Sequence, residues 1–176
     1  MKIAVYCSAK DSIPQEYLAL GESLGRWIGE TGHTLVYGGA TGGLMTRVSD
    51  AARAAGAKVI GVIPTRIIQA GRRANNCDEL YLVENMSQRK QMMKTMADCF
   101  ICLPGSYGTL DEMMDVTASG TVGEHHKPIY ILNYQGFYDS LMALTDHMRD
   151  LAFLPKEEHY APIYVHSLEE LYQMIH

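Results

Sequence analysis

The segment that most constrains the fold is residues 99–115. An apolar run from 99 to 103 ends at Pro104-Gly105, and apolar side chains then recur at helical spacing to about residue 120. This pattern predicts a buried strand, a tight loop and a helix that begins at Gly108. A glycine loop that opens onto the free N–H groups and positive dipole end of a helix favours an anion such as phosphate.

The rest of the chain repeats the alternation of strand and helix. We expect strands at 2–7, 34–38, 58–63, 80–83, 128–132 and 163–165, and helices at 15–31, from 43 to near 56, at 86–96, 137–151 and 167–175. Residues 65–79 are polar and show no clear period. Alternation of this kind is typical of an α/β fold, a doubly wound parallel sheet with helices on both faces. The length predicts one domain that spans 1–176.

Composition argues against two classes of partner. The chain of 176 residues has 47% hydrophobic and 20% charged residues, with a formal net charge of -5 at pH 7. That charge gives no global attraction to nucleic acid or to an anionic membrane. No signal-peptide core and no apolar stretch of membrane length is present in the sequence. We expect a cytoplasmic protein with no nucleic-acid or membrane partner.

Several chemistries lack their motifs. The loop at 8–12 has no G-x-G-x-x-G, and no Gly-Lys-Ser/Thr of a P-loop occurs in the chain. Cys99 and Cys102 form a C-x-x-C, but residues three apart in a strand face opposite sides. His125 and His126 have no second ligand cluster at a suitable spacing, so we read them as loop histidines. The sequence therefore predicts no cofactor and no metal.

Two further segments follow predicted strands and should open onto the same edge of the sheet as the loop at 104–108. The turn at 38–43 is rich in glycine, which either admits a ligand or only allows a helix to pack tightly on the sheet. Arg89 and Lys90 lie in the first turn of a helix, where cations oppose the dipole. A bound anion explains them better than helix stability does, although a solvated basic turn is the alternative. Together these features suit a nucleotide monophosphate or a sugar phosphate.

Glu112 has two interpretations. A lone carboxylate beside a phosphorylated ribose can stabilise an oxocarbenium-like centre or activate a water in N-glycosidic cleavage. Thr109 and Glu112 are also spaced as a capping box, in which both side chains satisfy the first helical N–H groups. Both interpretations remain open at the level of sequence.

Three segments resemble one known family. Residues 104–112 (PGSYGTLDE) are similar to the PGGxGTxxE signature of the Lonely Guy family, residues 37–45 to its YGGGxxGLM turn, and residues 86–90 to its MxxRK segment. These motifs follow in the family's order along nearly the whole chain. The family comprises cytokinin riboside 5'-monophosphate phosphoribohydrolases, often mislabelled lysine decarboxylases.

The resemblance implies hydrolysis of adenosine 5'-monophosphate (AMP), or of an N6-substituted riboside 5'-monophosphate, to the free base and ribose 5-phosphate. It also implies a homodimer of three-layer Rossmann-like subunits. The family's catalytic roles fall on Arg89 and Glu112. Its substrate contacts fall on Gly39, Gly42, Gly43, Met86, Lys90, Gly105, Gly108 and Thr109. The decarboxylase label has no support in the sequence, since nothing identifies a Schiff-base lysine with a partner for a pyridine nitrogen.

The chain departs from the family pattern at a few positions. Ser106 replaces the second glycine of PGG, which either changes the backbone angles of the loop or places a hydroxyl at the phosphate. Asp115 stands where many relatives have glutamate, one helical turn past Glu112 and on the same face. Residues 118–122 stand where many relatives have Thr-Trp-Ala-Gln-Leu, which bears on base specificity or on the dimer contact.

Two other functions compete with hydrolysis. A non-catalytic carrier of a phosphorylated cofactor, such as the molybdenum cofactor, would use the same anion sites without needing Glu112. A single-stranded nucleic-acid binder would need a basic patch with stacking aromatics, and the negative net charge of the chain argues against this function.

Overall fold

Parallel strands and the helices that connect them account for most of the chain. The computed structural model describes residues 1–155 and 157–175. The strands are β1 Lys2–Tyr6, β2 Thr34–Tyr37, β3 Lys58–Pro64, β4 Glu79–Val83, β5 Cys99–Cys102, β6 Ile129–Leu132 and β7 Ile163–Val165. The α-helices are α1 Gln15–Glu30, α2 Gly43–Ala54, α3 Thr65–Gln69, α4 Met86–Met96, α5 Tyr107–Thr121, α6 Asp139–Asp150 and α7 Leu168–Met174, and Tyr134–Gly136 form a 3-10 helix, η1.

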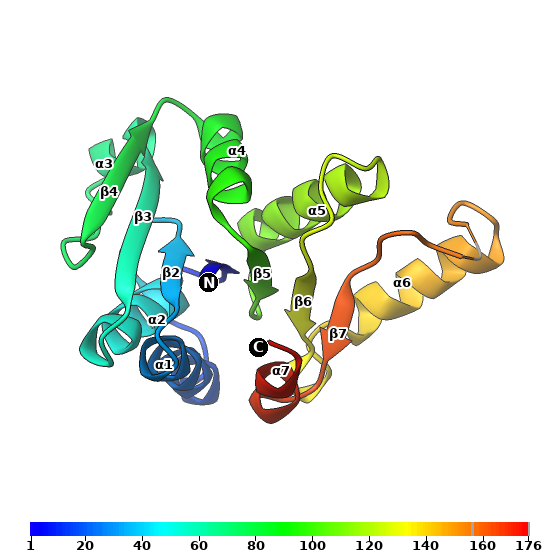
Figure 1. The fold of residues 1–176 in the computed structure, drawn as a ribbon, viewed down its shortest axis with the longest axis horizontal. Coiled ribbons are helices and arrows are strands. Elements are labelled where there is room, and N and C mark those ends of the chain that lie inside the picture. The colour runs from blue at the N-terminus through cyan, green and yellow to red at the C-terminus, as the bar shows by residue number, and fades with distance from the viewer. Residues whose placement is uncertain (156, 176) are drawn as a thin grey trace.

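The strands form one sheet in the order β4-β3-β2-β1-β5-β6-β7 (Figure 1). Every pairing is parallel. The chain winds outward in one direction from β1 to β4 and in the other from β5 to β7, so the sheet is doubly wound, which confirms the predicted fold class. Its reversal point lies between β1 and β5, where Val5 pairs with Ile101. Ligands of such sheets bind at the carboxyl ends of the strands beside this point.

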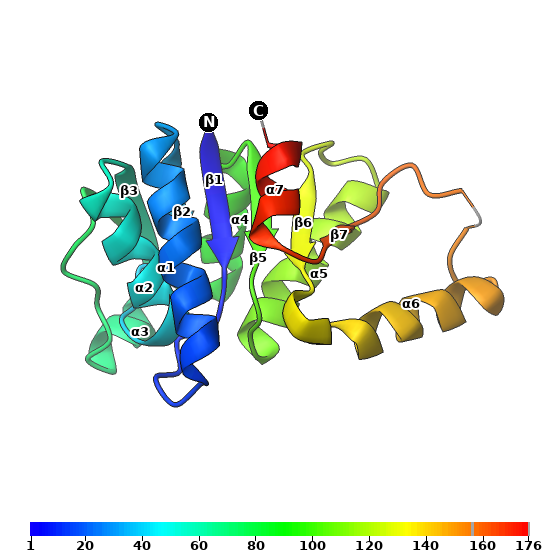
Figure 2. The ribbon, with the colours of Figure 1, turned by 90° about the horizontal axis from the view of Figure 1, so that it is seen from below.

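Helices cover both faces of the sheet. In Figure 1, α1, α2 and α7 lie on one side of the strands, while α4 and α5 lie on the other. Figure 2 shows the loops that follow β1 and β5 at the same edge of the sheet, opposite the edge where both termini lie. In both views α6 extends beyond the strands.

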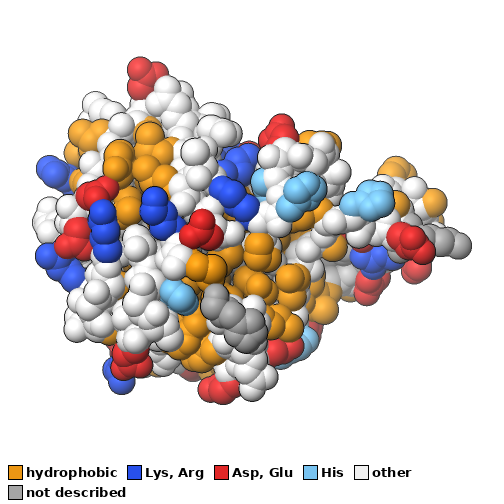
Figure 3. All heavy atoms as spheres, in the orientation of Figure 1, with side chains coloured by type: hydrophobic (Ala, Val, Ile, Leu, Met, Phe, Trp, Pro, Cys, Tyr) orange, Lys and Arg blue, Asp and Glu red, His pale blue; other side chains and the backbone are white. Residues whose placement is uncertain are grey.

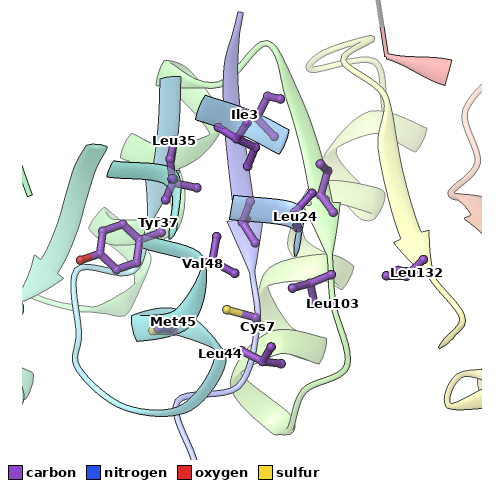
Figure 4. Close-up of a cluster of buried hydrophobic side chains, with 14 of the residues drawn as sticks. Ile3, Cys7, Leu24, Leu35, Tyr37, Leu44, Met45, Val48, Leu103 and Leu132 are labelled. Atoms are coloured by element: carbon purple, nitrogen blue, oxygen red, sulfur yellow. The ribbon is translucent and has the colours of Figure 1, made fainter. Parts of the chain in front are cut away.

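Each face of the sheet has its own hydrophobic core. Leu24 of α1 and Leu44 and Val48 of α2 pack with β1 and β2 in the first core (Figure 4). Met93 of α4 and Met113 of α5 belong to the second core. A strand buried on both sides must be apolar at every position, as the run at 99–103 is.

The two cysteines of the C-x-x-C lie in different cores. Cys99 belongs to the first and Cys102 to the second, so their side chains face opposite sides of the sheet as expected. Burial is the main cause that raises the pKa of Cys99, to about 11, and burial also raises that of Cys102. Neither thiol is therefore activated for redox chemistry.

The structure differs from the sequence-based expectations in a few elements. The apparently irregular segment at 65–79 contains the short helix α3, and α6 begins at Asp139, after η1, instead of at residue 137. Short elements of this kind carry too few residues for a clear hydrophobic period. None of the helices in residues 1–155 and 157–175 is long and apolar enough to cross a membrane.

Helices α1 and α2 pack closely because α1 presents glycine to its neighbour. A Cβ atom at Gly25 would overlap the carbonyl oxygen of Val48 and lie 3.0 Å from the Cβ of Ala51. Those obstacles are backbone and a short side chain, so neither can turn away.

We expect Gly25→Ala to destabilise the protein. Overpacking of this kind lowers the free energy of unfolding by about 1–3 kcal/mol. That loss should exceed the roughly 1 kcal/mol that alanine gains in helix propensity. Urea unfolding measures the change, with Ser23→Ala on the exposed side of the same helix as the control. A Gly25→Ala protein as stable as the Ser23→Ala protein would contradict this account of the packing.

Candidate active site

A buried ion pair joins α4 to α5. The side chain of Asn85 caps α4 by accepting a hydrogen bond from the N–H of Gln88 at 3.0 Å. Arg89 is the next residue, and its Nη2 donates a hydrogen bond to Oε1 of Glu112 on α5. Arg89 is only 5% exposed and Glu112 only 2%. The structure thus brings the two predicted catalytic residues into direct contact.

The guanidinium of Arg89 retains an unused donor. Its Nε–H has no hydrogen-bond partner among the described residues, although the atom is buried. Burial lowers the pKa of Arg89 from its usual value. A buried donor without a partner is costly, and such groups are common where a ligand binds.

Gly38, directly after β2, makes room for Arg89. A Cβ atom at this position would lie 3.3 Å from Nη1 of Arg89 and 3.1 Å from the terminal methyl carbon of Met45. The sequence placed Gly38 in the glycine-rich turn but did not select it as a site residue. Its only sequence signal is the absence of a side chain, which the other glycines of the turn share.

Further ion pairs extend the contact between α4 and α5. Lys90 Nζ lies 2.7 Å from Asp111 Oδ1 and 3.6 Å from Asp115 Oδ1. Lys94 Nζ lies 2.8 Å from Asp115 Oδ2. Figure 3 shows Lys and Arg side chains close to where α4 meets α5. We call these four residues, with Arg89 and Glu112, the α4–α5 ladder.

The ladder controls the charge of Lys90. Burial lowers the pKa of its ammonium group, but Asp111 and Asp115 outweigh burial and raise the pKa above the usual value. Lys90 therefore stays cationic and is held by carboxylates. Contact of Lys90 and Asp115 with a substrate remains a prediction.

The capping-box interpretation of Glu112 is wrong. Helix α5 begins at Tyr107, so Ser106 is its N-cap and Thr109 is the third helical residue. Glu112 gives its carboxylate to Arg89 instead. The sequence alone could not separate the alternatives, because Thr109 and Glu112 are three residues apart whether the N-cap is Thr109 or Ser106.

The first turn of α5 is open to a ligand. The Ser106 side chain makes no capping hydrogen bond, and the first turn contains no acidic residue. Ser106, Tyr107 and Gly108 are exposed, and a Cβ at Gly108 would meet nothing within 4 Å. Free N–H groups and the dipole of a helix of 15 residues thus face solvent at the loop that includes Gly105.

The second glycine turn packs against the loop between β1 and α1. The N–H of Gly43 donates to Oδ1 of Asp11 at 2.8 Å, and that of Gly42 donates to Oγ1 of Thr46 at 2.8 Å. A Cβ at Gly42 would lie only 2.5 Å from the carbonyl oxygen of Ala9. These contacts give the two glycines a packing role, and contact of Gly42 or Gly43 with a substrate remains a prediction.

Two further predicted residues, Gly39 and Met86, lie outside the α4–α5 ladder. The carbonyl of Gly39 accepts a hydrogen bond from the N–H of Ala74 at 3.0 Å, which anchors the segment after α3. Met86 is exposed at the first turn of α4, and Met114 of α5 is 42% exposed. Direct contact of Gly39 or Met86 with a substrate remains a prediction.

The histidines within residues 1–155 and 157–175 have no metal-binding arrangement. Nε2 of His125 lies 3.0 Å from the carbonyl oxygen of Val116, and its ring packs edge-on against Tyr160. In the part of the chain that the structure describes, no group of three or more His, Cys, Asp or Glu side chains could hold a metal ion.

Comparison with known proteins places the chain in a family. A family model described as "Possible lysine decarboxylase" matches residues 45–175. A cytokinin riboside 5'-monophosphate phosphoribohydrolase of Mycobacterium marinum is 39% identical over 97% of this chain and 91% of its own length. The chain belongs to the Lonely Guy family. A rice protein, the probable cytokinin riboside 5'-monophosphate phosphoribohydrolase LOGL9, is 36% identical over 96% of this chain and 78% of its own length.

Similarity to a solved structure supports the fold and carries no information on function. The molybdenum cofactor binding protein of Rippkaea orientalis has a TM-score of 0.75 and 21% sequence identity, and the match covers 99% of this chain and 94% of that one. Members of the Lonely Guy family whose names describe phosphoribohydrolases are enzymes, and the sequence similarity groups this chain with them. Family membership confirms the resemblance found in the three sequence motifs.

We expect removal of one partner of the buried pair to be costly. Glu112→Ala leaves the Arg89 charge buried without a partner, which should lower the free energy of unfolding by about 3–5 kcal/mol. The double variant Arg89→Met/Glu112→Leu removes both charges and should be more stable than Glu112→Ala. Urea unfolding of the wild type and of both variants measures these differences, and a double variant no more stable than Glu112→Ala would contradict a direct pair.

Proposed function

We propose that the protein hydrolyses the N-glycosidic bond of AMP or of an N6-substituted riboside 5'-monophosphate. The products are the free base and ribose 5-phosphate. The observation that carries the proposal is the buried Arg89–Glu112 pair, one turn beyond the open N-terminus of α5. The names of the similar proteins from M. marinum and rice support the same reaction.

The start of α5 holds the 5'-phosphate. Gly105, Ser106, Gly108 and Thr109 form the loop and first turn, where backbone N–H groups and the helix dipole favour an anion. The hydroxyl of Ser106, free of a capping bond, adds a donor at this position. Anchoring the phosphate here fixes the ribose relative to Glu112, one turn further along the helix.

Glu112 acts at the ribose. Cleavage of the N-glycosidic bond develops positive charge at the anomeric carbon, which a carboxylate stabilises. The same carboxylate accepts a proton from the attacking water, whose oxygen forms the new bond to the anomeric carbon as the base leaves. Arg89 positions the carboxylate, and its free Nε–H offers a donor to a ribose hydroxyl.

The remaining predicted residues surround this centre. Lys90 and Asp115 order the helix faces beside the ribose through the α4–α5 ladder. Met86, exposed at the start of α4, contacts the base. The protein acts as a cytoplasmic homodimer, and the exposed side chain of Met114 contributes to the apolar surface that the second subunit covers.

A carrier of a phosphorylated cofactor is the competing function. Such a protein needs the phosphate site at the start of α5 but has no use for a carboxylate on the ribose side of it. The buried contact between Glu112 and Arg89 therefore favours hydrolysis.

Base release from AMP and from isopentenyl-AMP tests the proposal. We expect the wild-type protein to release base, and Glu112→Gln to lower kcat by about 100-fold or more because an amide can neither accept the proton nor stabilise the positive charge. Chromatography of the free base measures the rate, and Ser23→Ala is the control. Tight binding of a monophosphate without base release would favour the carrier, and full activity of Glu112→Gln would remove that residue from the catalytic step.

A further inference from the structure

The α4–α5 ladder supplies no net charge for a phosphate. Its cations are Arg89, Lys90 and Lys94, and its carboxylates are those of Asp111, Glu112 and Asp115. Three positive and three negative charges sum to zero. A phosphomonoester carries a charge of about -1.5 to -2 near neutral pH. Charge to balance it must come from outside the ladder.

Lys10 is a cation that the ladder leaves out. It lies in the loop between β1 and α1, with its side chain exposed. Within residues 1–155 and 157–175 its ammonium group makes no ion pair. The neighbouring carboxylate of Asp11 bonds instead to the N–H of Gly43 at 2.8 Å, which ties the loop to the start of α2. The backbone N–H of Lys10 donates to Oγ of Ser8 at 3.2 Å, which further fixes the loop.

Lys10 shares a cavity with the phosphate loop. This cavity of about 210 Å³ is lined on one side by Ser8 and Lys10 and on another by Pro104, Gly105 and Ser106, and its remaining wall is apolar, from Ile13, Pro14, Tyr17 and Phe137. It lies between the loops that follow β1 and β5, beside the reversal point of the sheet. The loop that carries Lys10 therefore lies across this cavity from the residues that precede the first turn of α5.

Other cations near this edge are already engaged. Nη2 of Arg72 donates to the carbonyl oxygens of Ala9 and Thr41, each at 3.2 Å. Arg47 pairs with Glu22 at 2.6 Å. Neither arginine lines the cavity that contains Gly105 and Ser106. Of the cations in the described residues, Lys10 is thus the one that lines this cavity without a carboxylate partner.

We propose that Lys10 binds the phosphate group that the start of α5 holds, and that it determines the preference for phosphorylated over unphosphorylated ligands. An ammonium group on a flexible stem suits a phosphate that the helix already orients, because it acts as a point charge without a fixed geometry. The identity of the ligand as a nucleoside monophosphate rests on the proposed function. The assignment of Lys10 to a sugar phosphate does not require hydrolysis.

The test compares Lys10→Gln with Lys2→Gln. Lys2 lies at the other end of β1, so both variants lose one positive charge but only one loses it at the cavity. Isothermal titration with ribose 5-phosphate measures affinity, and titration with ribose provides the uncharged comparison. We expect Lys10→Gln to bind ribose 5-phosphate about tenfold more weakly, which corresponds to about 1.4 kcal/mol, and Lys2→Gln to bind as the wild type does.

Additional measurements exclude a structural cause. Lys10→Arg restores the charge and should bind ribose 5-phosphate within about threefold of the wild type, because phosphate accepts either cation. The thermal unfolding midpoint of Lys10→Gln should match that of Lys2→Gln, since the replaced side chain is exposed. In the base-release assay, Lys10→Gln should raise the KM for AMP and leave kcat nearly unchanged. Salt should weaken ribose 5-phosphate binding more in the wild type than in Lys10→Gln.

The outcomes separate this inference from the proposed function. Equal affinities of Lys10→Gln and Lys2→Gln for ribose 5-phosphate overturn the role of Lys10, as does a wild-type protein that does not bind this compound. Base release with an unchanged KM in Lys10→Gln overturns the role of Lys10 while keeping the hydrolase. Lys10-dependent binding without base release from any monophosphate overturns hydrolysis alone.

Discussion

The buried ion pair between Arg89 and Glu112 is the contact on which the rest of the site depends. Two charges removed from water need each other, because either one alone would be left uncompensated. Their contact therefore fixes α4 against α5 and sets the position of the carboxylate relative to the start of α5. The same requirement limits what the pair contributes to stability, since much of its attraction offsets the cost of burial. Its clearest effect is on position, which is the property that the proposed role of Glu112 needs.

The topology of the sheet determines which loops can cooperate with that pair. Because β1 and β5 are neighbours at the reversal point, the loops that follow them meet at one edge although they are distant in sequence. The two glycine-rich turns then differ in use. The turn at 104–108 leaves the start of α5 open, whereas Gly42 and Gly43 receive the backbone of the β1–α1 loop and the carboxylate of Asp11. Similar glycine patterns thus leave a helix end open to solvent in one case and turn it toward the protein itself in the other.

Hydrophobic periodicity was sufficient to predict the fold and to place the candidate site residues at the starts of helices. Each apolar run bounded by Gly, Pro or polar residues became a strand, and Arg89 and Lys90 were selected because cations are unfavourable at the start of a helix. The bond between Asp11 and Gly43 joins residues 32 apart, and its geometry exists only once the sheet has formed. The role of Gly38 and the choice of Ser106 over Thr109 as the cap depend likewise on packing and on the first residue of a helix, which sequence patterns locate only approximately.

The distribution of charge along this edge suits the chemistry of glycoside cleavage. Positive charge develops at the anomeric carbon in the transition state, so a surplus of cations near the ribose would oppose the reaction. The α4–α5 ladder avoids that surplus because every one of its cations faces a carboxylate. A phosphate requires the opposite, an excess of positive potential, which in our proposal the start of α5 and Lys10 provide on the other side of the loop. Separating a neutral ribose region from a positive phosphate region lets one small site hold a dianion and still stabilise a cation a few atoms away.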